Sequence, residues 1–202
     1  MLEKGGAFMP EPVILPYDRR AAVAYAHRWA YGRNPAYFDF EELGGDCTNF
    51  ASQCLYAGAR VMNFTPEYGW YYRDPNDKAP AWTGVEYFYN FLVREQVSPG
   101  PFGVNTGLEE MEPGDFVQLR FANREVFSHT PVIVATGSPP SLDNLLVAAH
   151  SYDADYRPLS SYLFDEIRFL HILGVYPPEP ADQTGEGQAE QNPRHWPPFF
   201  FF

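Results

Sequence analysis

The chain has 202 residues, 45% of them hydrophobic, which suits one domain with a sizeable core and excludes a disordered protein. Its 26 acidic and 14 basic residues give a net charge of −12. An acidic surface argues against nucleic acid and anionic membranes as partners, because both are bound through basic patches.

The first half of the chain predicts an extended lead-in followed by helices. Residues 1–17 are rich in proline and are expected to be extended. Asp18 is a candidate N-cap for the first helix, and Gly32 is a natural end for it. Apolar residues at helical spacing predict three helices, over residues 19–31, over residues 47–57 and from Thr83 onward.

The second half of the chain changes to the alternating pattern of strands. Four strands are predicted, over residues 116–121, 129–136, 145–151 and 167–175. Short connections make consecutive strands antiparallel neighbours. We therefore expect an α+β domain over residues 18–176, with N-terminal helices packed on an antiparallel sheet. Residues 177–202 have the composition of a flexible, proline-rich tail.

Cys47 is the residue most suited to chemistry. It follows the Gly44-Gly45 turn and falls at the predicted start of a helix, where backbone N–H groups and the helix dipole favour a thiolate. Cys54 is expected about two turns later on the same helix, too far away for a disulfide, and is interpreted as a buried apolar residue. The cysteines lack the spacing of metal ligands, so no metal or other cofactor is expected.

Two histidines can complete a nucleophilic site. His129 opens the second predicted strand and His150 ends the third. Antiparallel pairing makes the two positions near neighbours, the geometry that a base and its orienting group need. Each histidine alone also has a structural explanation, and His27 and His171 are interpreted as structural.

The segment Gly45-Asp46-Cys47-Thr48-Asn49-Phe50 resembles the nucleophile motif of papain-like bacterial amidases and peptidases, the NlpC/P60 and CHAP groups. Pro113-Gly114-Asp115 and the strand that begins at His129 resemble two further motifs of these groups. The similarity is strongest to the amidase domain family of the Amidase_6 type, over about residues 18–176.

The resemblance implies a papain-like fold with Cys47 as nucleophile, His129 as general base and acid, and His150 as the group that orients the imidazole. Asp153 and Asn144 are weaker candidates for that last role. The backbone N–H of Cys47 is expected to bind the oxyanion, together with a second donor that the sequence does not identify.

An aromatic segment between the helices contains Trp70 and Tyr71, and Trp82 follows it. These residues are candidates for a substrate-binding cleft, and the alternative is that they cover the core.

The resulting hypothesis is a cysteine-dependent hydrolase of an amide bond in a peptide or a peptidoglycan stem peptide. A binding or structural module of the same fold and an acyltransferase are the alternatives. The sequence shows no apolar segment typical of a secretory signal and no run of about 18 apolar residues, so neither a signal peptide nor a transmembrane helix is expected. The compartment stays open between cytoplasm, by default, and a secreted or cell-wall location. The oligomeric state also stays open.

Overall fold

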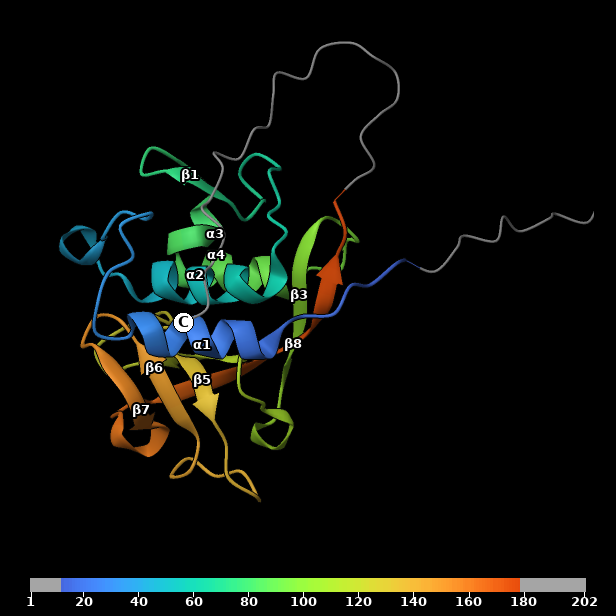
Figure 1. Ribbon diagram of the computed structural model, residues 1–202. Coiled ribbons are helices and arrows are strands. Elements are labelled where there is room, and N and C mark those ends of the chain that lie inside the picture. Colours follow the sequence, from blue (N-terminus) through green and yellow to red (C-terminus); the bar gives the residue numbers. More distant parts are fainter. Residues whose placement is uncertain (1–11, 179–202) are drawn as a thin grey trace, which may run out of the picture.

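The computed structural model describes residues 12–178, so the start of the predicted lead-in and nearly all of the predicted tail lie outside the described residues. The α-helices lie in the middle and upper part of the molecule in Figure 1. They are α1 (Arg19–Trp29), α2 (Cys47–Ala59), α3 (Pro80–Thr83) and α4 (Val85–Leu92). Asp18 caps α1 as predicted, because its carboxylate accepts a hydrogen bond of 3.0 Å from the backbone N–H of Ala21.

A six-stranded antiparallel sheet lies under the helices, in the order β3-β8-β4-β5-β6-β7. Its strands are β3 (Gly100–Thr106), β4 (Phe116–Arg120), β5 (Val132–Ala135), β6 (Leu146–Ala149), β7 (Ala154–Pro158) and β8 (Glu166–Tyr176). A separate hairpin consists of β1 (Tyr72–Asp74) and β2 (Asp77–Lys78). Three short 3₁₀ helices are η1 (Glu41–Leu43), η2 (Leu108–Glu110) and η3 (Leu159–Ser161).

The sheet separates two apolar cores, because side chains of a strand alternate between its faces. On β4, Phe116 belongs to the core under the helices, whereas Val117 and Leu119 belong to the core on the opposite face. On β5, Val132 and Ile133 divide in the same way. In Figure 1, α1 crosses in front of β5 and β6, so the helix-side core lies between these layers.

The α+β class with helices on an antiparallel sheet is confirmed, and the sheet is larger than predicted. The four predicted strands form β4, β5, β6 and β8, while β3 and β7 at the two edges were not predicted. The third predicted helix forms α4, with Gly84 and not Thr83 as its N-cap, and the short helix α3 before it was not predicted. Leu15 of the predicted lead-in exchanges backbone hydrogen bonds of 2.8 and 3.0 Å with Val175 of β8.

Candidate functional site

Cys47 is the first residue of α2, as the sequence predicts. The turn before it contains Gly44 and Gly45 with φ of 118° and 111°, a conformation that favours glycine. Asp46 is the N-cap residue, but its side chain does not cap the helix. The carboxylate instead accepts hydrogen bonds from the backbone N–H of Phe40 and from other partners. The first turn of α2 is therefore left without an acceptor from its N-cap side chain.

The thiol of Cys47 lies against the chain on both sides of His129. Its Sγ atom is 3.9 Å from the carbonyl oxygen of Ser128, and it also accepts a hydrogen bond from the backbone of Thr130. On the same helix turn, the hydroxyl of Thr48 lies 3.1 Å from the hydroxyl of Thr130. These contacts hold the start of α2 against the segment that leads into β5.

Burial raises the pKa of Cys47 above its usual value, and the hydrogen bonds from Thr130 and Thr48 oppose that shift. The residue as a whole is 7% exposed. Cys54, in contrast, is fully buried in the helix-side core, in agreement with its interpretation as an apolar residue.

His129 lies on the far face of the sheet from the helix-side core. His129 forms an isolated antiparallel β-bridge with Leu119, whose side chain belongs to the core on the far face of the sheet. The centroid of the His129 ring is 5.5 Å from that of Tyr162. Burial, aided by the positive charge of Arg157, lowers the pKa of His129 to about 4. The imidazole is therefore neutral at pH 7, the form that can accept a proton. Among the described residues, no hydrogen bond joins His129 to Cys47.

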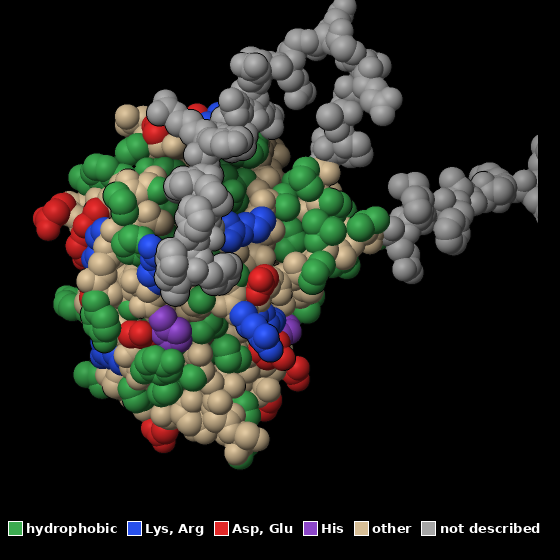
Figure 2. All heavy atoms as spheres, in the orientation of Figure 1, with side chains coloured by type: hydrophobic (Ala, Val, Ile, Leu, Met, Phe, Trp, Pro, Cys, Tyr) green, Lys and Arg blue, Asp and Glu red, His purple; other side chains and the backbone are tan. Residues whose placement is uncertain are grey.

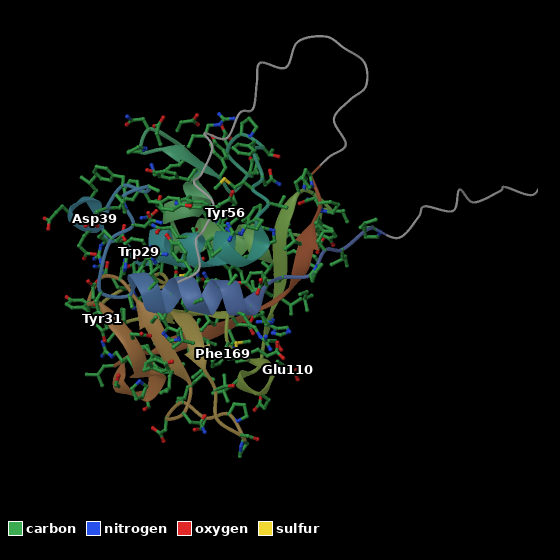
Figure 3. All side chains as sticks on the ribbon, in the orientation of Figure 1. Trp29, Tyr31, Asp39, Tyr56, Glu110 and Phe169 are labelled. Carbon is green, nitrogen blue, oxygen red and sulfur yellow. The ribbon has the colours of Figure 1, made fainter. Side chains whose placement is uncertain are left out.

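His150 lies on the helix-side face of the sheet, where its ring stacks on Phe50 at 3.9 Å. Its Nδ1 atom is 2.6 Å from a carboxylate oxygen of Asp46, and its Nε2 atom is 2.8 Å from the carbonyl oxygen of Trp29. Trp29 is labelled at the end of α1 in Figure 3. A carbonyl and a carboxylate both accept hydrogen bonds, so each ring nitrogen of His150 faces an acceptor.

The expected pairing of the two histidines is thus replaced by a pairing of His150 with Asp46. The strands are antiparallel neighbours as predicted, with Val132 opposite Ala148. This register sets Thr130, and not His129, opposite His150. A difference of one position turns a side chain to the other face of a sheet, so the two imidazoles point away from each other.

Arg33 is a residue near this site that the sequence analysis did not single out. Its guanidinium forms a two-pronged ion pair with Asp153, both distances being 3.0 Å. Its Nε atom is 3.8 Å from Asp46 and is buried without a hydrogen-bond partner. Asp153 is thus engaged by Arg33, and Asn144 binds the loop around Pro139 and Ser141. Neither alternative orienting group hydrogen-bonds His129 within the described chain.

Two of the predicted substrate-binding aromatics are core residues. Trp70 and Trp82 are fully buried, and their rings lie 5.0 Å apart. The indole N–H groups donate hydrogen bonds to Ser52 and Asn49 of α2, at 3.0 and 2.8 Å. These two side chains therefore cover the core, which was the alternative interpretation. Tyr71 lies outside that core, with its ring tilted by 33° and 5.1 Å from the ring of Phe64.

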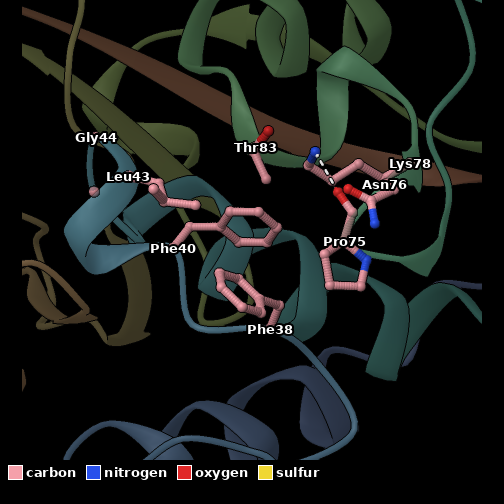
Figure 4. Close-up of a pocket in the computed structure, with 9 residues that line it drawn as sticks. Phe38, Phe40, Leu43, Gly44, Pro75, Asn76, Lys78 and Thr83 are labelled. Atoms are coloured by element: carbon pink, nitrogen blue, oxygen red, sulfur yellow. Dashed lines mark hydrogen bonds between the residues drawn. The ribbon is translucent and has the colours of Figure 1, made fainter.

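A pocket of about 600 Å³ lies beside the turn that precedes Cys47. Figure 4 shows the aromatic rings of Phe38 and Phe40 on one side and Lys78 on the other. Lys78 donates a hydrogen bond of 3.0 Å to the carbonyl of Pro75 and lies over the ring of Phe40. The remaining lining comes from Leu43, Gly44, Gly45, Asn76 and Thr83. The pocket combines apolar walls with one cation, and its lining includes Gly45, two residues before Cys47.

A second pocket, of about 630 Å³, lies over α1 and is lined by Arg19, Arg20 and His27 among others. Figure 2 shows acidic and basic side chains interspersed on the face of the molecule that displays α1. Beside this pocket, the buried carboxylate of Asp115 binds Arg19 at 2.6 Å and His171 at 2.7 Å. His171 therefore has a structural partner, in line with its interpretation as a structural residue.

Within residues 12–178, no cluster of three or more histidine, cysteine or acidic side chains is suited to hold a metal ion. Nor is any helix in that range long and apolar enough to span a bilayer.

The comparisons with known proteins point to one family. The family model described as "Putative amidase domain" matches residues 16–173. A protein of Bacillus subtilis (strain 168) described as "Uncharacterized protein YhbB" is 34% identical over 145 residues, which cover 70% of this chain. The match spans 43% of that relative, so this chain corresponds to less than half of its length. No solved structure is significantly similar to the chain. Because the family match covers most of the chain, including Cys47, His129 and His150, this protein belongs to the family described as "Putative amidase domain".

Proposed function

We propose that the protein is a cysteine-dependent hydrolase of amide bonds, with Cys47 as nucleophile and His129 as general base and acid. The observation that carries the proposal is the position of the Cys47 thiol, at the start of α2 and against the backbone on both sides of His129. Membership of an amidase-named family supports the reaction class. We include in the proposal a papain-like relationship of the fold, which the nucleophile motif suggests.

In the proposed reaction, the thiol proton passes to the neutral imidazole of His129 as Sγ attacks the carbonyl carbon of the amide. The carbonyl electron pair moves to oxygen, and backbone N–H groups at the start of α2 stabilise the resulting oxyanion. Collapse breaks the C–N bond, and His129 returns the proton to the leaving amine. Water then cleaves the thioester, releasing a carboxylic acid and regenerating the thiol.

The protonation states favour this order of events over a preformed ion pair. The pKa of Cys47 is raised and that of His129 is lowered to about 4, so both groups are neutral in the resting site. A neutral thiol must lose its proton during the attack, which gives His129 a role as base. Hydrogen bonds of a catalytic pair are often long before substrate binds, and we propose that the Cys47–His129 contact forms in the complex.

We propose a peptide, or the stem peptide of peptidoglycan, as the substrate. The pocket beside Gly44 and Gly45 supports this choice, because its aromatic walls suit a side chain and its cation Lys78 suits a carboxylate. The net charge of −12 disfavours nucleic acid and anionic membranes as alternative partners.

The reaction is tested with soluble muropeptides and a set of N-acylated peptide amides, with new amines and carboxylates identified by mass spectrometry. The wild-type protein and Cys54→Ala are expected to cleave the same bond, whereas Cys47→Ala leaves every substrate intact. Cys54→Ala is the matched control, since it removes a thiol from the same helix. Cleavage by Cys47→Ala at the wild-type rate would exclude cysteine catalysis by this residue.

A binding module of the same fold is a second candidate, and one observation favours it. Cys47 and His129 are both neutral and share no hydrogen bond within the described chain. A binding module would retain muropeptides in equilibrium dialysis and release them unchanged. An acyltransferase would instead form a new amide when an amine acceptor is added, which the same product analysis detects.

A further inference from the structure

Tyr162 carries a buried hydroxyl group that donates no hydrogen bond to any of the described residues. The residue follows η3, is 8% exposed and belongs to the far-side core that also borders His129. Its oxygen is one of two buried side-chain polar atoms among the described residues that lack a partner, the other being Nε of Arg33. More than nine-tenths of the side chain is thus removed from water while its polar end is unsatisfied.

Such an arrangement is unfavourable for folding. Leaving a buried donor without a partner costs about 1–3 kcal/mol, and phenylalanine would fill almost the same space without that cost. Buried tyrosine hydroxyls usually find a hydrogen-bond partner. A hydroxyl kept at this position therefore suggests a partner that binds during function.

The surroundings of Tyr162 indicate what that partner is. Its ring lies 5.5 Å from the ring of His129, and the guanidinium of Arg157 lies 3.8 Å above its face. Arg157 is held by hydrogen bonds of 2.8 and 3.2 Å to Ser161, and none of its contacts within residues 12–178 is an ion pair with a carboxylate. Tyr162 thus lies beside His129, the candidate base, and beside the positive charge of Arg157.

The thiol lies in the same neighbourhood, because Sγ of Cys47 is 3.9 Å from the carbonyl oxygen of Ser128, the residue before His129. Burial raises the pKa of Tyr162, the charge of Arg157 and its polar contact with the phenol oxygen oppose this shift, and a negative charge on Cys47 raises the pKa further. The last effect means that charge on the sulfur acts on the phenol. A phenol in this position can donate a hydrogen bond to the oxyanion that forms on the carbonyl carbon when Sγ bonds to that carbon.

We propose that the hydroxyl of Tyr162 is the second donor of the oxyanion site, acting together with the backbone N–H groups at the start of α2. This inference rests on the proposed function of Cys47 and His129. As Sγ bonds to the carbonyl carbon, the electron pair of the C=O bond moves to oxygen, and Tyr162 donates its hydrogen bond to that oxygen. The phenol keeps its proton throughout, and the hydrogen bond is released when the C–N bond breaks.

The test compares Tyr162→Phe with the wild-type protein in two reactions of the same thiol. The peptide aldehyde N-acetyl-alanyl-alaninal adds reversibly to a cysteine: the S–C bond forms, the thiol proton passes to His129, and the former carbonyl oxygen becomes an oxyanion. Its adduct therefore needs the oxyanion donors. Iodoacetamide alkylates the thiol with loss of iodide and forms no oxyanion, so its rate reports only the access and ionisation of Cys47.

The inference predicts that Tyr162→Phe weakens aldehyde binding about 10- to 100-fold and lowers kcat about 100-fold, as loss of one oxyanion donor does. The alkylation rate should change less than about twofold. The melting temperature should stay the same or rise, since the substitution removes an unsatisfied group. Tyr156→Phe, on the neighbouring strand β7 and 55% exposed, is the matched control and should leave all four quantities unchanged.

Two results would overturn the inference. One is unchanged aldehyde binding and kcat in Tyr162→Phe, and the other is a fall in melting temperature that matches the loss of binding, which would make the role structural. Failure of the proposed function has a different signature. In that case, wild-type Cys47 forms no aldehyde adduct, and Cys47→Ala has the same activity as the wild-type protein.

Discussion

A carboxylate oxygen of Asp46 lies 2.6 Å from Nδ1 of His150, and both side chains are 1% exposed. The residue directly before the candidate nucleophile is thus held by the histidine that the sequence predicts as an orienting group. His150 acts on the turn that carries Cys47 and is bonded at its other nitrogen to the carbonyl of Trp29. The contact joins α1, the start of α2 and the end of β6.

The first prediction concerns this pair. His150→Ala leaves the buried Asp46 carboxylate without one of its hydrogen-bond partners, and such a loss at a buried charged group costs about 3 kcal/mol of unfolding free energy. Urea unfolding at pH 7 measures the loss. His27→Ala is the control, because its pair with Asp155 is partly exposed and should contribute less than about 1 kcal/mol. Equal losses of unfolding free energy in His150→Ala and His27→Ala would show that the buried pair contributes no more to stability than the partly exposed pair.

The second prediction is a pH dependence of stability that comes from His129. Its pKa is about 4 in the folded protein and about 6.5 when unfolded. The unfolded chain binds the proton more tightly, so the contribution is fully present above pH 6.5 and is lost as the pH falls toward 4. The difference amounts to about 3 kcal/mol.

Unfolding free energies of the wild-type protein and His129→Gln at pH 7 and pH 4 measure this contribution. The glutamine does not titrate, so the gap between the two proteins should change by about 3 kcal/mol in favour of the variant at the lower pH. If the difference in unfolding free energy between the two proteins were the same at both pH values, the pKa of His129 would be the same in the folded and unfolded states, which contradicts the prediction. Titration of the other acidic groups affects both proteins alike.

The third prediction separates packing from substrate binding at Trp82. Trp82→Phe removes the donor to Asn49 and leaves a small cavity, so unfolding free energy should fall by about 2 kcal/mol. KM for a cleaved muropeptide should stay within about twofold. Tyr68→Phe, at an 81% exposed position in the aromatic segment before Trp82, is the control and should change neither the unfolding free energy nor KM. A large rise in KM without a loss of stability would restore a substrate-binding role for Trp82.

The fourth prediction assigns substrate binding to the pocket beside Gly44 and Gly45. Phe38 lines this pocket and is 43% exposed, so Phe38→Ala removes apolar contact at little cost to the core. Loss of about 1 kcal/mol of contact raises KM about fivefold and leaves kcat unchanged. Tyr87→Ala, at a 59% exposed position on α4, is the control. A fall in kcat alone would place Phe38 in the chemical step.

Local patterns in the sequence predicted much of this architecture. The helix start at Cys47 was predictable because glycines in a tight turn precede a helical apolar stripe. Four of the six sheet strands follow from alternating apolar residues. The edge strands β3 and β7 were not predicted, since β3 contains glycine and proline and β7 is mostly polar.

The partners of the site residues depend on contacts that a single sequence does not contain. The register between β5 and β6 decides which side chains share a face, and a change of one position separates His129 from His150. The unsatisfied hydroxyl of Tyr162 is defined by its missing partner, which only coordinates can reveal. Burial likewise decided between the two interpretations of Trp70 and Trp82.

The most direct test of the central claim is to trap the acyl-enzyme. The folded protein is mixed with p-nitrophenyl acetate, quenched with acid during the first turnover, digested and analysed by peptide mass spectrometry. We predict an acetyl group on Cys47 that hydroxylamine removes, none on Cys54, and slower acetylation in His129→Gln. Acetylation of Cys54 in preference to Cys47, or hydrolysis that proceeds at the same rate in Cys47→Ala, would contradict the account.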